Sequence, residues 1–362
     1  MRVLHFLHYA RGGIVTVVLT QITQSADPAI EYHLAVLEHS DDLVREAQRL
    51  GVRLHVLGSS LPGLPWRYLQ LLRKVKPDVV HTHSYVPRVL TAAAAFTGSR
   101  FVRVSTMHND YPYFHAATLR SRFKRGSEAL SLRSGSTLTI CGSEQVRTAV
   151  ASRYRLSPAR LRRIHNGITI RTPGPEAAGV TDVGGPVVVT VGRVSEQKNY
   201  AMLIDCWRDV SRRVPEAALW IVGDGEQRAM LEARARAYGL ASVKFWGWQA
   251  AEDVTAILRR ADIFVLSSLH ESLPTAMLEA FAAGLPVVTT RVAGADEVVE
   301  PGVNGHIVDD AAGLTRALET MLALPPVERA AMGARGRERV LRDFTAARFV
   351  RDVEQTYREC LA

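Results

Sequence analysis

Short β-branched runs alternate with amphipathic stretches along the whole chain, and this alternation limits the fold more than any other feature. Strands that alternate with helices form parallel sheets through right-handed crossovers. The runs are nearly continuous in apolar residues, as in strands covered by helices on both faces. The expected strands are Val3–Leu7, Arg53–Leu57, Asp78–Thr82, Phe101–Thr106 and Thr137–Cys141, then Val187–Val191, Leu219–Val222, Val243–Trp246, Ile263–Ser267 and Pro286–Thr290.

The length and one Pro/Gly-rich segment divide the chain in two. A chain of 362 residues fits two domains of about 150 residues each. Arg171–Pro186 contains three Pro and four Gly without apolar periodicity, which indicates a linker. We therefore expect two Rossmann-like, doubly wound α/β domains, residues 1–170 and 187–343, with a C-terminal helix over 344–362. The helical spacing of Phe349, Val353 and Tyr357 predicts the packing side of that helix. Ligands of such sheets bind beyond the carboxyl ends of the strands, here in a cleft between facing domains.

Charge is distributed unevenly between the two halves. Residues 1–170 contain 23 Lys and Arg against 10 Asp and Glu, a net charge of +13, whereas the remainder carries −4. The first half is therefore expected to face something anionic, such as nucleic acid, anionic lipid or a phosphorylated substrate. An Arg-rich surface without a partner fits the same count, so charge alone does not choose.

The apolar runs and the cysteines argue against a membrane-spanning, a disulfide-bonded or a zinc-binding protein. The longest apolar candidate, Leu90–Phe96, is far shorter than the roughly 18 residues of a membrane span. Met1–Tyr9 has the pattern of a first strand and not of a signal peptide. Three cysteines without paired spacing indicate a reducing compartment, with no disulfide framework or zinc site.

Two glycines, Gly12 and Gly13, follow the first strand. Glycines here let a backbone approach a ligand closely, and the following helix offers amides to a phosphate. The pair lacks the spacing of the dinucleotide fingerprint, so a tight turn without a ligand is equally compatible.

Two cations follow the first strand of the second half. Arg193 and Lys198, after Gly192, lie five residues apart in a strand-to-helix loop and can converge on one diphosphate. Two solvated surface charges are the alternative, but the position at the carboxyl end of a strand favours a binding role.

Two carboxylates flank a predicted helix start in the second half. Glu271 precedes Pro274, which suits a first helical turn, and Glu279 lies further along the helix. This layout suits a nucleotide sugar, with Glu271 on sugar hydroxyls, helix amides near Thr275 on phosphates, and Glu279 on ribose hydroxyls. A capping acid and an ordinary surface Glu are the alternative.

Histidines follow two strands of the first half. His108 lies where a strand delivers a side chain to the predicted cleft, although a lone His is more often structural. His81 and His83 are weaker candidates. We do not interpret them as a zinc pair, because we expect their side chains to diverge and see no third ligand.

Together these segments resemble the retaining glycosyltransferases of family 4, which have the GT-B fold. The resemblance covers nearly the whole chain and is most specific in the second half. The matching segments are Gly12-Gly13, Asp78–His83, Thr106–His108, His165–Ile168, Val191–Asn199, Val222–Glu226, Phe245–Trp248 and Glu271–Val288.

The resemblance implies a role for each candidate residue. Arg193 and Lys198 would stabilise the leaving diphosphate, and Glu279 would bind ribose. His108 would contact the donor sugar. Glu271 and the backbone of Leu273, Pro274 and Thr275 would hold the sugar and the phosphates. Further donor contacts would come from Gly12, Gly13 and Gly192, and the backbone around Trp246–Trp248 would meet the base.

The resemblance also implies the reaction. The chain would move a hexose or N-acetylhexosamine from a UDP- or GDP-sugar to a glycan or lipid-linked acceptor in cell-envelope or exopolysaccharide synthesis, with retention. No Asp-x-Asp sequence occurs, so neither a metal nor another cofactor is expected. Alternatives are a sugar-nucleotide 2-epimerase and a non-catalytic nucleotide-sugar-binding protein. A nucleic-acid partner is not expected, because no recognised reading module occurs.

The acceptor is expected on the basic first domain. Leu119–Arg133 carries five basic residues against one Glu, with Phe123, Leu130 and Leu132 interspersed, after the aromatic segment Asn109–Ala117. This composition indicates either contact with an anionic membrane or a solvated helix face. The expected location is the cytoplasm, and the first of these alternatives would add contact with the inner face of the cytoplasmic membrane.

Overall fold

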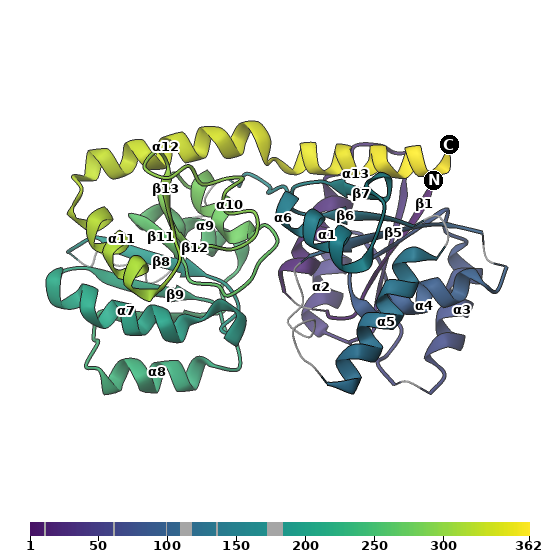
Figure 1. Ribbon diagram of the computed structural model, residues 1–362, viewed down its shortest axis with the longest axis horizontal. Coiled ribbons are helices and arrows are strands. Elements are labelled where there is room, and N and C mark those ends of the chain that lie inside the picture. The colour runs from purple at the N-terminus through teal and green to yellow at the C-terminus, as the bar shows by residue number, and fades with distance from the viewer. Residues whose placement is uncertain (11, 61, 99, 109–117, 135–136, 172–183) are drawn as a thin grey trace. The chain divides into compact units, whose positions relative to one another are not determined.

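The computed structural model describes the chain except residues 11, 61, 99, 109–117, 135–136 and 172–183 (Figure 1). The chain forms two compact units. The first contains Met1–Gly167 and Ala346–Ala362, and the second contains Ile168–Thr345. Most of the predicted linker Arg171–Pro186 lies outside the described residues.

The first unit is built on seven parallel strands in the order β3-β2-β1-β4-β5-β6-β7. Strand order reverses between β1 and β4, which is the topological switch point. Successive side chains of β1 point to opposite faces, so Val3 packs on the α13 side and Leu4 on the α3 side. The strands are β1 Arg2–Leu7, β2 Glu31–Val36, β3 Arg53–Val56, β4 Val79–Thr82, β5 Val102–Met107, β6 Thr137–Cys141 and β7 Leu161–Arg163.

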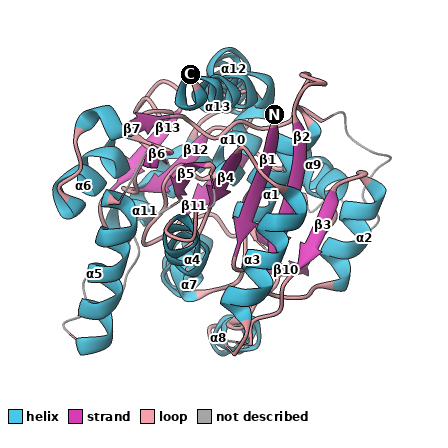
Figure 2. Ribbon diagram, turned by 90° about the vertical axis from the view of Figure 1, so that its right-hand side faces the viewer, coloured by secondary structure: helices cyan, strands magenta, loops and turns pink. Residues whose placement is uncertain are grey.

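Helices cover both faces of this sheet (Figure 2). The C-terminal helix α13 lies along one face (Figure 1), where Phe349, Val353 and Tyr357 are buried against Val3. The spacing of these three side chains predicted this packing side. The helices are α1 Gly13–Thr23, α2 Asp41–Arg49, α3 Leu64–Val75, α4 Tyr85–Ala95, α5 Leu119–Arg133, α6 Glu144–Tyr154 and α13 Ala346–Leu361.

The second unit has six parallel strands in the order β10-β9-β8-β11-β12-β13, with its switch point between β8 and β11. One face packs against Phe281 and Val340 and the other against Trp207 and Leu314. The strands are β8 Val187–Val191, β9 Ala218–Val222, β10 Val243–Gly247, β11 Ile263–Leu266, β12 Val287–Thr290 and β13 Gly305–Val308. The helices are α7 Tyr200–Arg213, α8 Arg228–Ala237, α9 Ala251–Arg260, α10 Thr275–Ala282, α11 Ala311–Ala323 and α12 Pro326–Asp343.

Three strands of the structure were not predicted from the sequence. β2 begins with Glu31 and includes His33, β7 is Leu-Arg-Arg, and β13 is Gly-His-Ile-Val. Their sequences lack the continuous apolar run of a doubly covered strand. β7 and β13 lie at sheet edges, where one side needs no strand partner.

No helix in the described part of the chain combines the length and the apolar character that a membrane span requires.

Candidate functional site

Backbone hydrogen bonds join the loops that follow β8 and β9 to each other and to the last residue of β10. The Val194 amide donates to the Asp224 carbonyl at 3.0 Å, and the Gly223 amide donates to the Gly247 carbonyl at 2.8 Å. A Cβ on Gly223, whose φ is 129°, would lie 2.0 Å from the carbonyl oxygen of Gly192. Only glycine permits this approach, and the loops form one platform at the carboxyl ends of the strands.

The loop after β11 is fastened to the loop after β8 across the switch point. The Ser267 hydroxyl donates to the Lys198 carbonyl at 2.8 Å. The Leu269 amide donates to the Gln197 carbonyl at 2.8 Å, and the Gln197 side chain donates to the His270 carbonyl at 2.9 Å. These bonds hold the backbone in place at Lys198 and next to Glu271.

Lys198 and Glu271 form an ion pair at this point. Lys198 Nζ lies 2.7 Å from Glu271 Oε1, which also accepts a 2.8 Å hydrogen bond from the Ser268 hydroxyl. The two side chains are 15% and 11% exposed. Burial acts to lower the pKa of Lys198, but the Glu271 carboxylate and Tyr200 outweigh it, and the pKa is raised. The ammonium is therefore charged at neutral pH.

Gly192 makes room for this lysine. A Cβ at position 192 would lie 2.9 Å from Lys198 Cε and 3.1 Å from the Tyr200 hydroxyl. The small residue before Arg193 therefore serves the packing of the site lysine.

Arg193 pairs with a different carboxylate. Its guanidinium lies 3.1 Å from Glu226, and the side chains are 69% and 56% exposed. An exposed pair of this kind contributes at most about 1 kcal/mol, so Arg193 can leave it for a ligand. Sequence reasoning assigned no role to Glu226 or to Ser268, although Glu226 lay within a recognised segment.

Helix α10 begins at Thr275. Pro274 precedes the helix as its cap, so the prediction that it occupies the first helical turn was wrong by one residue. The first amides of a helix have no acceptor within it, and they lie at the positive end of its dipole. Leu273 is buried in the core, so only its backbone is suited to meeting a ligand.

Glu279 lies in the second turn of α10. Burial raises the pKa of its carboxyl to about 7, although the positive charge of Arg171 acts in the opposite direction. This carboxyl therefore changes charge near neutral pH, which no feature of the sequence predicts.

Trp246 is held at the end of β10. Its ring meets Trp220 edge to face at 5.3 Å, and Lys244 Nζ lies 3.6 Å from its centre. Its carbonyl accepts a 2.9 Å hydrogen bond from Gln249. By contrast, Trp248, two residues on, is 75% exposed. Within the predicted segment Trp246–Trp248, Trp248 is therefore the residue with the larger aromatic surface exposed.

The predicted residues of the first unit follow β1 and β5. Gly12 precedes α1 with φ 100°, a backbone conformation that favours glycine, and Gly13 is the first residue of the helix. Among the described residues, no atom lies within 4 Å of a Cβ built on Gly13. His108 is partly exposed, and its Nε2 lies 2.9 Å from Nδ1 of His83.

The expectation that His81 and His83 diverge, with no third ligand near, was wrong. Residues two apart on a strand share a face, and His5 of β1 is the register partner of His81. Side-chain nitrogens of His5, His81 and His83 lie within 4.8 Å of one another. The sequence showed all three residues, but only strand order made β1 and β4 neighbours.

Helix α5 carries an apolar stripe between basic residues. Leu119, Phe123 and Leu130 are 83%, 74% and 69% exposed. Leu132 is fully buried, so its placement among the surface residues was wrong. The aromatic segment 109–117 lies outside the described residues.

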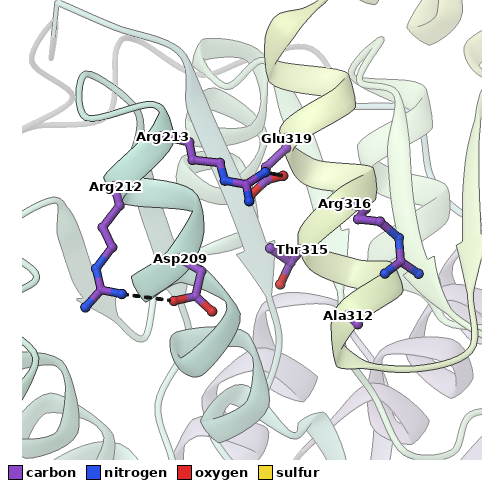
Figure 3. A pocket seen from close by; sticks show the side chains of 7 residues that line it. All are labelled: Asp209, Arg212, Arg213, Ala312, Thr315, Arg316 and Glu319. Atoms are coloured by element: carbon purple, nitrogen blue, oxygen red, sulfur yellow. Dashed lines mark hydrogen bonds and ion pairs between the residues drawn. The ribbon is translucent and has the colours of Figure 1, made fainter.

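A hollow lies between α7 and α11 (Figure 3). An ion pair of 2.8 Å joins Arg213 to Glu319, and one of 3.5 Å joins Arg212 to Asp209. No predicted site residue lines it. The lining residues are Asp209, Arg212, Arg213, Ala312, Thr315, Arg316 and Glu319.

The chain matches two known family models and a curated relative. Residues 11–171 match the model described as Glycosyltransferase Family 4, and residues 177–339 match that of Glycosyl transferases group 1. The lipopolysaccharide core biosynthesis glycosyltransferase LpsE of Rhizobium meliloti is 30% identical over 286 residues, 78% of this chain and 76% of that protein. The chain belongs to glycosyltransferase family 4. It is therefore a glycosyltransferase, as the family resemblance implied.

The chain is also similar to a solved structure in its fold and to a second relative over part of its sequence. Anabaena HepE, solved in complex with UDP and glucose, superimposes with a TM-score of 0.86 at 19% identity, covering 99% of this chain and 100% of that chain. This likeness confirms the predicted GT-B fold. A GDP-mannose-dependent phosphatidylinositol monomannoside mannosyltransferase of Mycolicibacterium smegmatis is 38% identical over 162 residues, 42% of each chain.

Proposed function

We propose that this family 4 enzyme transfers a hexose or N-acetylhexosamine, with retention, from a UDP- or GDP-sugar to a glycan or lipid-linked acceptor in cell-envelope polysaccharide synthesis. The Lys198–Glu271 pair, held at the switch point of the second sheet, carries the proposal. Similarity to LpsE supports the pathway. HepE with UDP and the GDP-mannose-dependent relative leave the choice of base to experiment.

Each side chain then has a defined task. The Lys198 ammonium and the Arg193 guanidinium oppose the negative charge that develops on the leaving diphosphate. Glu271, oriented by Ser268, accepts hydrogen bonds from sugar hydroxyls. Glu279 accepts hydrogen bonds from the ribose diol when it is ionised. His108 contacts the donor sugar, the role that family resemblance gives it.

The reaction breaks the bond between the anomeric carbon and the diphosphate oxygen. A bond forms on the same face between the anomeric carbon and the acceptor oxygen, and the acceptor's proton passes to the departing phosphate oxygen. The products are a glycoside and a nucleoside diphosphate. No metal is needed in this scheme, because Lys198 and Arg193 supply the positive charge, so turnover should survive EDTA.

A thermal-shift screen against UDP- and GDP-sugars identifies the donor, because a bound ligand raises the apparent stability. The donor found is then incubated with and without acceptor glycans, and products are separated. We expect the nucleoside diphosphate to accumulate with acceptor and the product to keep the anomeric configuration. An epimerised donor formed without acceptor, or tight binding without single-turnover transfer, would instead support the two alternatives.

We further propose that α5 rests on an anionic membrane during transfer to a lipid-linked acceptor. The exposed stripe of Leu119, Phe123 and Leu130 has helical spacing, and four cations (Arg120, Arg122, Lys124 and Arg125) lie on the same helix. Sedimentation with vesicles at low salt tests this. Binding to anionic but not zwitterionic vesicles is expected, and it should weaken in Phe123→Ser but not in Trp66→Ser, another exposed aromatic on a helix of the same unit. Equal binding by both variants would contradict it.

A further inference from the structure

Three buried imidazoles occupy the switch point of the first sheet. His5, His81 and His83 are 0%, 1% and 1% exposed. Of their six ring nitrogens, all except Nε2 of His5 have a hydrogen-bond partner among the described residues. A metal ion at this cluster would have to replace several of these bonds, so the cluster is first of all a hydrogen-bond network.

The network has two lines. In the first, Nδ1 of His5 lies 2.9 Å from Nε2 of His83, and Nδ1 of His83 lies 2.9 Å from Nε2 of His108. In the second, His81 is bonded to the hydroxyls of Tyr357 at 2.5 Å and Thr106 at 2.7 Å. The first line therefore runs from the sheet interior to a partly exposed candidate site residue.

Proton positions along the first line depend on one another. A neutral imidazole has one N–H and one lone pair, so each link needs a donor on one ring and an acceptor on the next. If His5 carries its proton on Nδ1, then His83 and His108 must do so too. If His5 carries it on Nε2, the other two must carry theirs on Nε2.

The buried end of the line selects between these states. Nε2 of His5 has no acceptor among the described residues. An orphaned buried N–H is rarer than an unused acceptor, so the Nδ1–H state of His5 is favoured. This choice leaves His108 with its proton on Nδ1.

The imidazoles of this line are uncharged. Burial lowers the pKa of His5 to about 3, and burial with the nearby charge of Arg88 lowers the pKa of His108 to about 3. The pKa of His83 is also well below its usual range, through burial and the neighbouring histidines. A neutral His108 offers a hydrogen bond but no positive charge.

We propose that His5 and His83 are positioning residues that hold His108 as the Nδ1–H tautomer, so that it donates an uncharged hydrogen bond to a hydroxyl of the donor sugar. The last step rests on the proposed function, whereas the tautomer does not. Two residues buried in the sheet thus set what a third, just after the carboxyl end of β5, presents to the substrate.

Two-bond ¹H–¹⁵N correlation spectra of ¹⁵N-histidine-labelled protein at pH 7 report the tautomer of each ring. We expect His5, His83 and His108 to be neutral with the proton on Nδ1. A His108 ring that is charged or protonated on Nε2 would overturn the proposal. So would saturable binding of Zn²⁺ that shifts the His5 and His83 signals together. Neither the tautomer measurement nor the Zn²⁺ titration requires enzyme activity. A failed transfer assay would therefore count against the proposed function and not against the predicted tautomer.

His5→Phe removes the end of the line, with His55→Phe as its matched control. His55 forms the same kind of imidazole pair with His33, at 3.0 Å, elsewhere in the sheet. In His5→Phe we expect a mixture of tautomers at His108 and a fall of about tenfold in kcat/KM for the nucleotide sugar. Affinity for the nucleoside diphosphate, which lacks the sugar, should be unchanged. His55→Phe should alter none of these quantities. An unchanged His108 tautomer in folded His5→Phe would show that His5 does not set the tautomer of His108.

Discussion

The two sheets have the same switch-point topology but carry opposite chemistry there. In the second unit, loops after β8 and β11 present a charged pair, Lys198 and Glu271. In the first unit, β1 and β4 bring together the uncharged rings of His5, His81 and His83. Topology fixes where polar groups gather in both sheets.

Burial and pairing account for the difference. Lys198 keeps partial contact with solvent and has an opposite charge at 2.7 Å, so its charged form is favoured. His5 is fully buried, and its hydrogen-bond partner is another imidazole, so burial favours the neutral form. The charged switch point is suited to a diphosphate and the neutral one to hydroxyl groups.

Removing the charge of the second switch point should have the largest effect. Lys198→Met should lower kcat by about 100- to 1,000-fold, because the leaving diphosphate loses a preorganised cation. It should also lower the free energy of unfolding by about 3–5 kcal/mol, because Glu271 stays largely buried without its partner. Steady-state kinetics and denaturant unfolding measure the two losses.

The double variant Lys198→Met/Glu271→Gln separates the two losses. No unpaired carboxylate remains, so most of the stability should return while turnover stays low. Recovery of turnover together with stability would show that the pair is only structural.

Arg193→Ala should lower kcat by about 100-fold with little change in stability. Its side chain is 69% exposed, and surface substitutions usually alter stability by no more than about 0.5 kcal/mol. Arg212→Ala is the matched control, since Arg212 is an exposed arginine with one carboxylate partner near the hollow of Figure 3. Near-normal turnover in Arg193→Ala would remove Arg193 from the diphosphate site.

Glu279 should make the stability of the protein depend on pH in one direction. Its folded pKa of about 7 lies above the unfolded value of 4.5, so the unfolded state loses its proton first as pH rises. Stability is therefore lost between about pH 4.5 and 7, up to about 3 kcal/mol. Denaturant unfolding of the wild type and Glu279→Gln over this range should give a difference of that sign. Parallel curves would indicate an ordinary carboxylate.

His5 should give the opposite sign. Its folded pKa of about 3 lies below the unfolded value of 6.5, so its contribution is full above pH 6.5 and is lost as pH falls. Between pH 6 and 5, wild type should lose up to about 1.4 kcal/mol per pH unit more than His5→Phe. Equal slopes would mean that this ring is charged in the folded protein, which would abolish the contrast between the two sheets.

More of the second switch point than of the first could be predicted from the sequence. Lys198 and Glu271 follow the apolar strands β8 and β11 in segments of mixed, specific composition, so their positions at the carboxyl ends of strands could be predicted, while their binding roles stay predictions. His5 lies inside a strand, where a single histidine carries no local signal, and only the pairing of β1 with β4 reveals its partners. Similarly, nothing local to Glu226 or Ser268 showed which charged side chain each would contact.

The sequence by itself determined the alternation of strands and helices, the two-domain organisation, the loops that carry the candidate site residues, and the family. These follow from periodicity and from residue types at fixed spacing, which are local properties. The tertiary structure alone decided which strands became neighbours, how deeply each titratable group was buried and which partner it met. Protonation depends on those three quantities, so the charge on Glu279 and the neutral line from His5 to His108 emerged only from the fold.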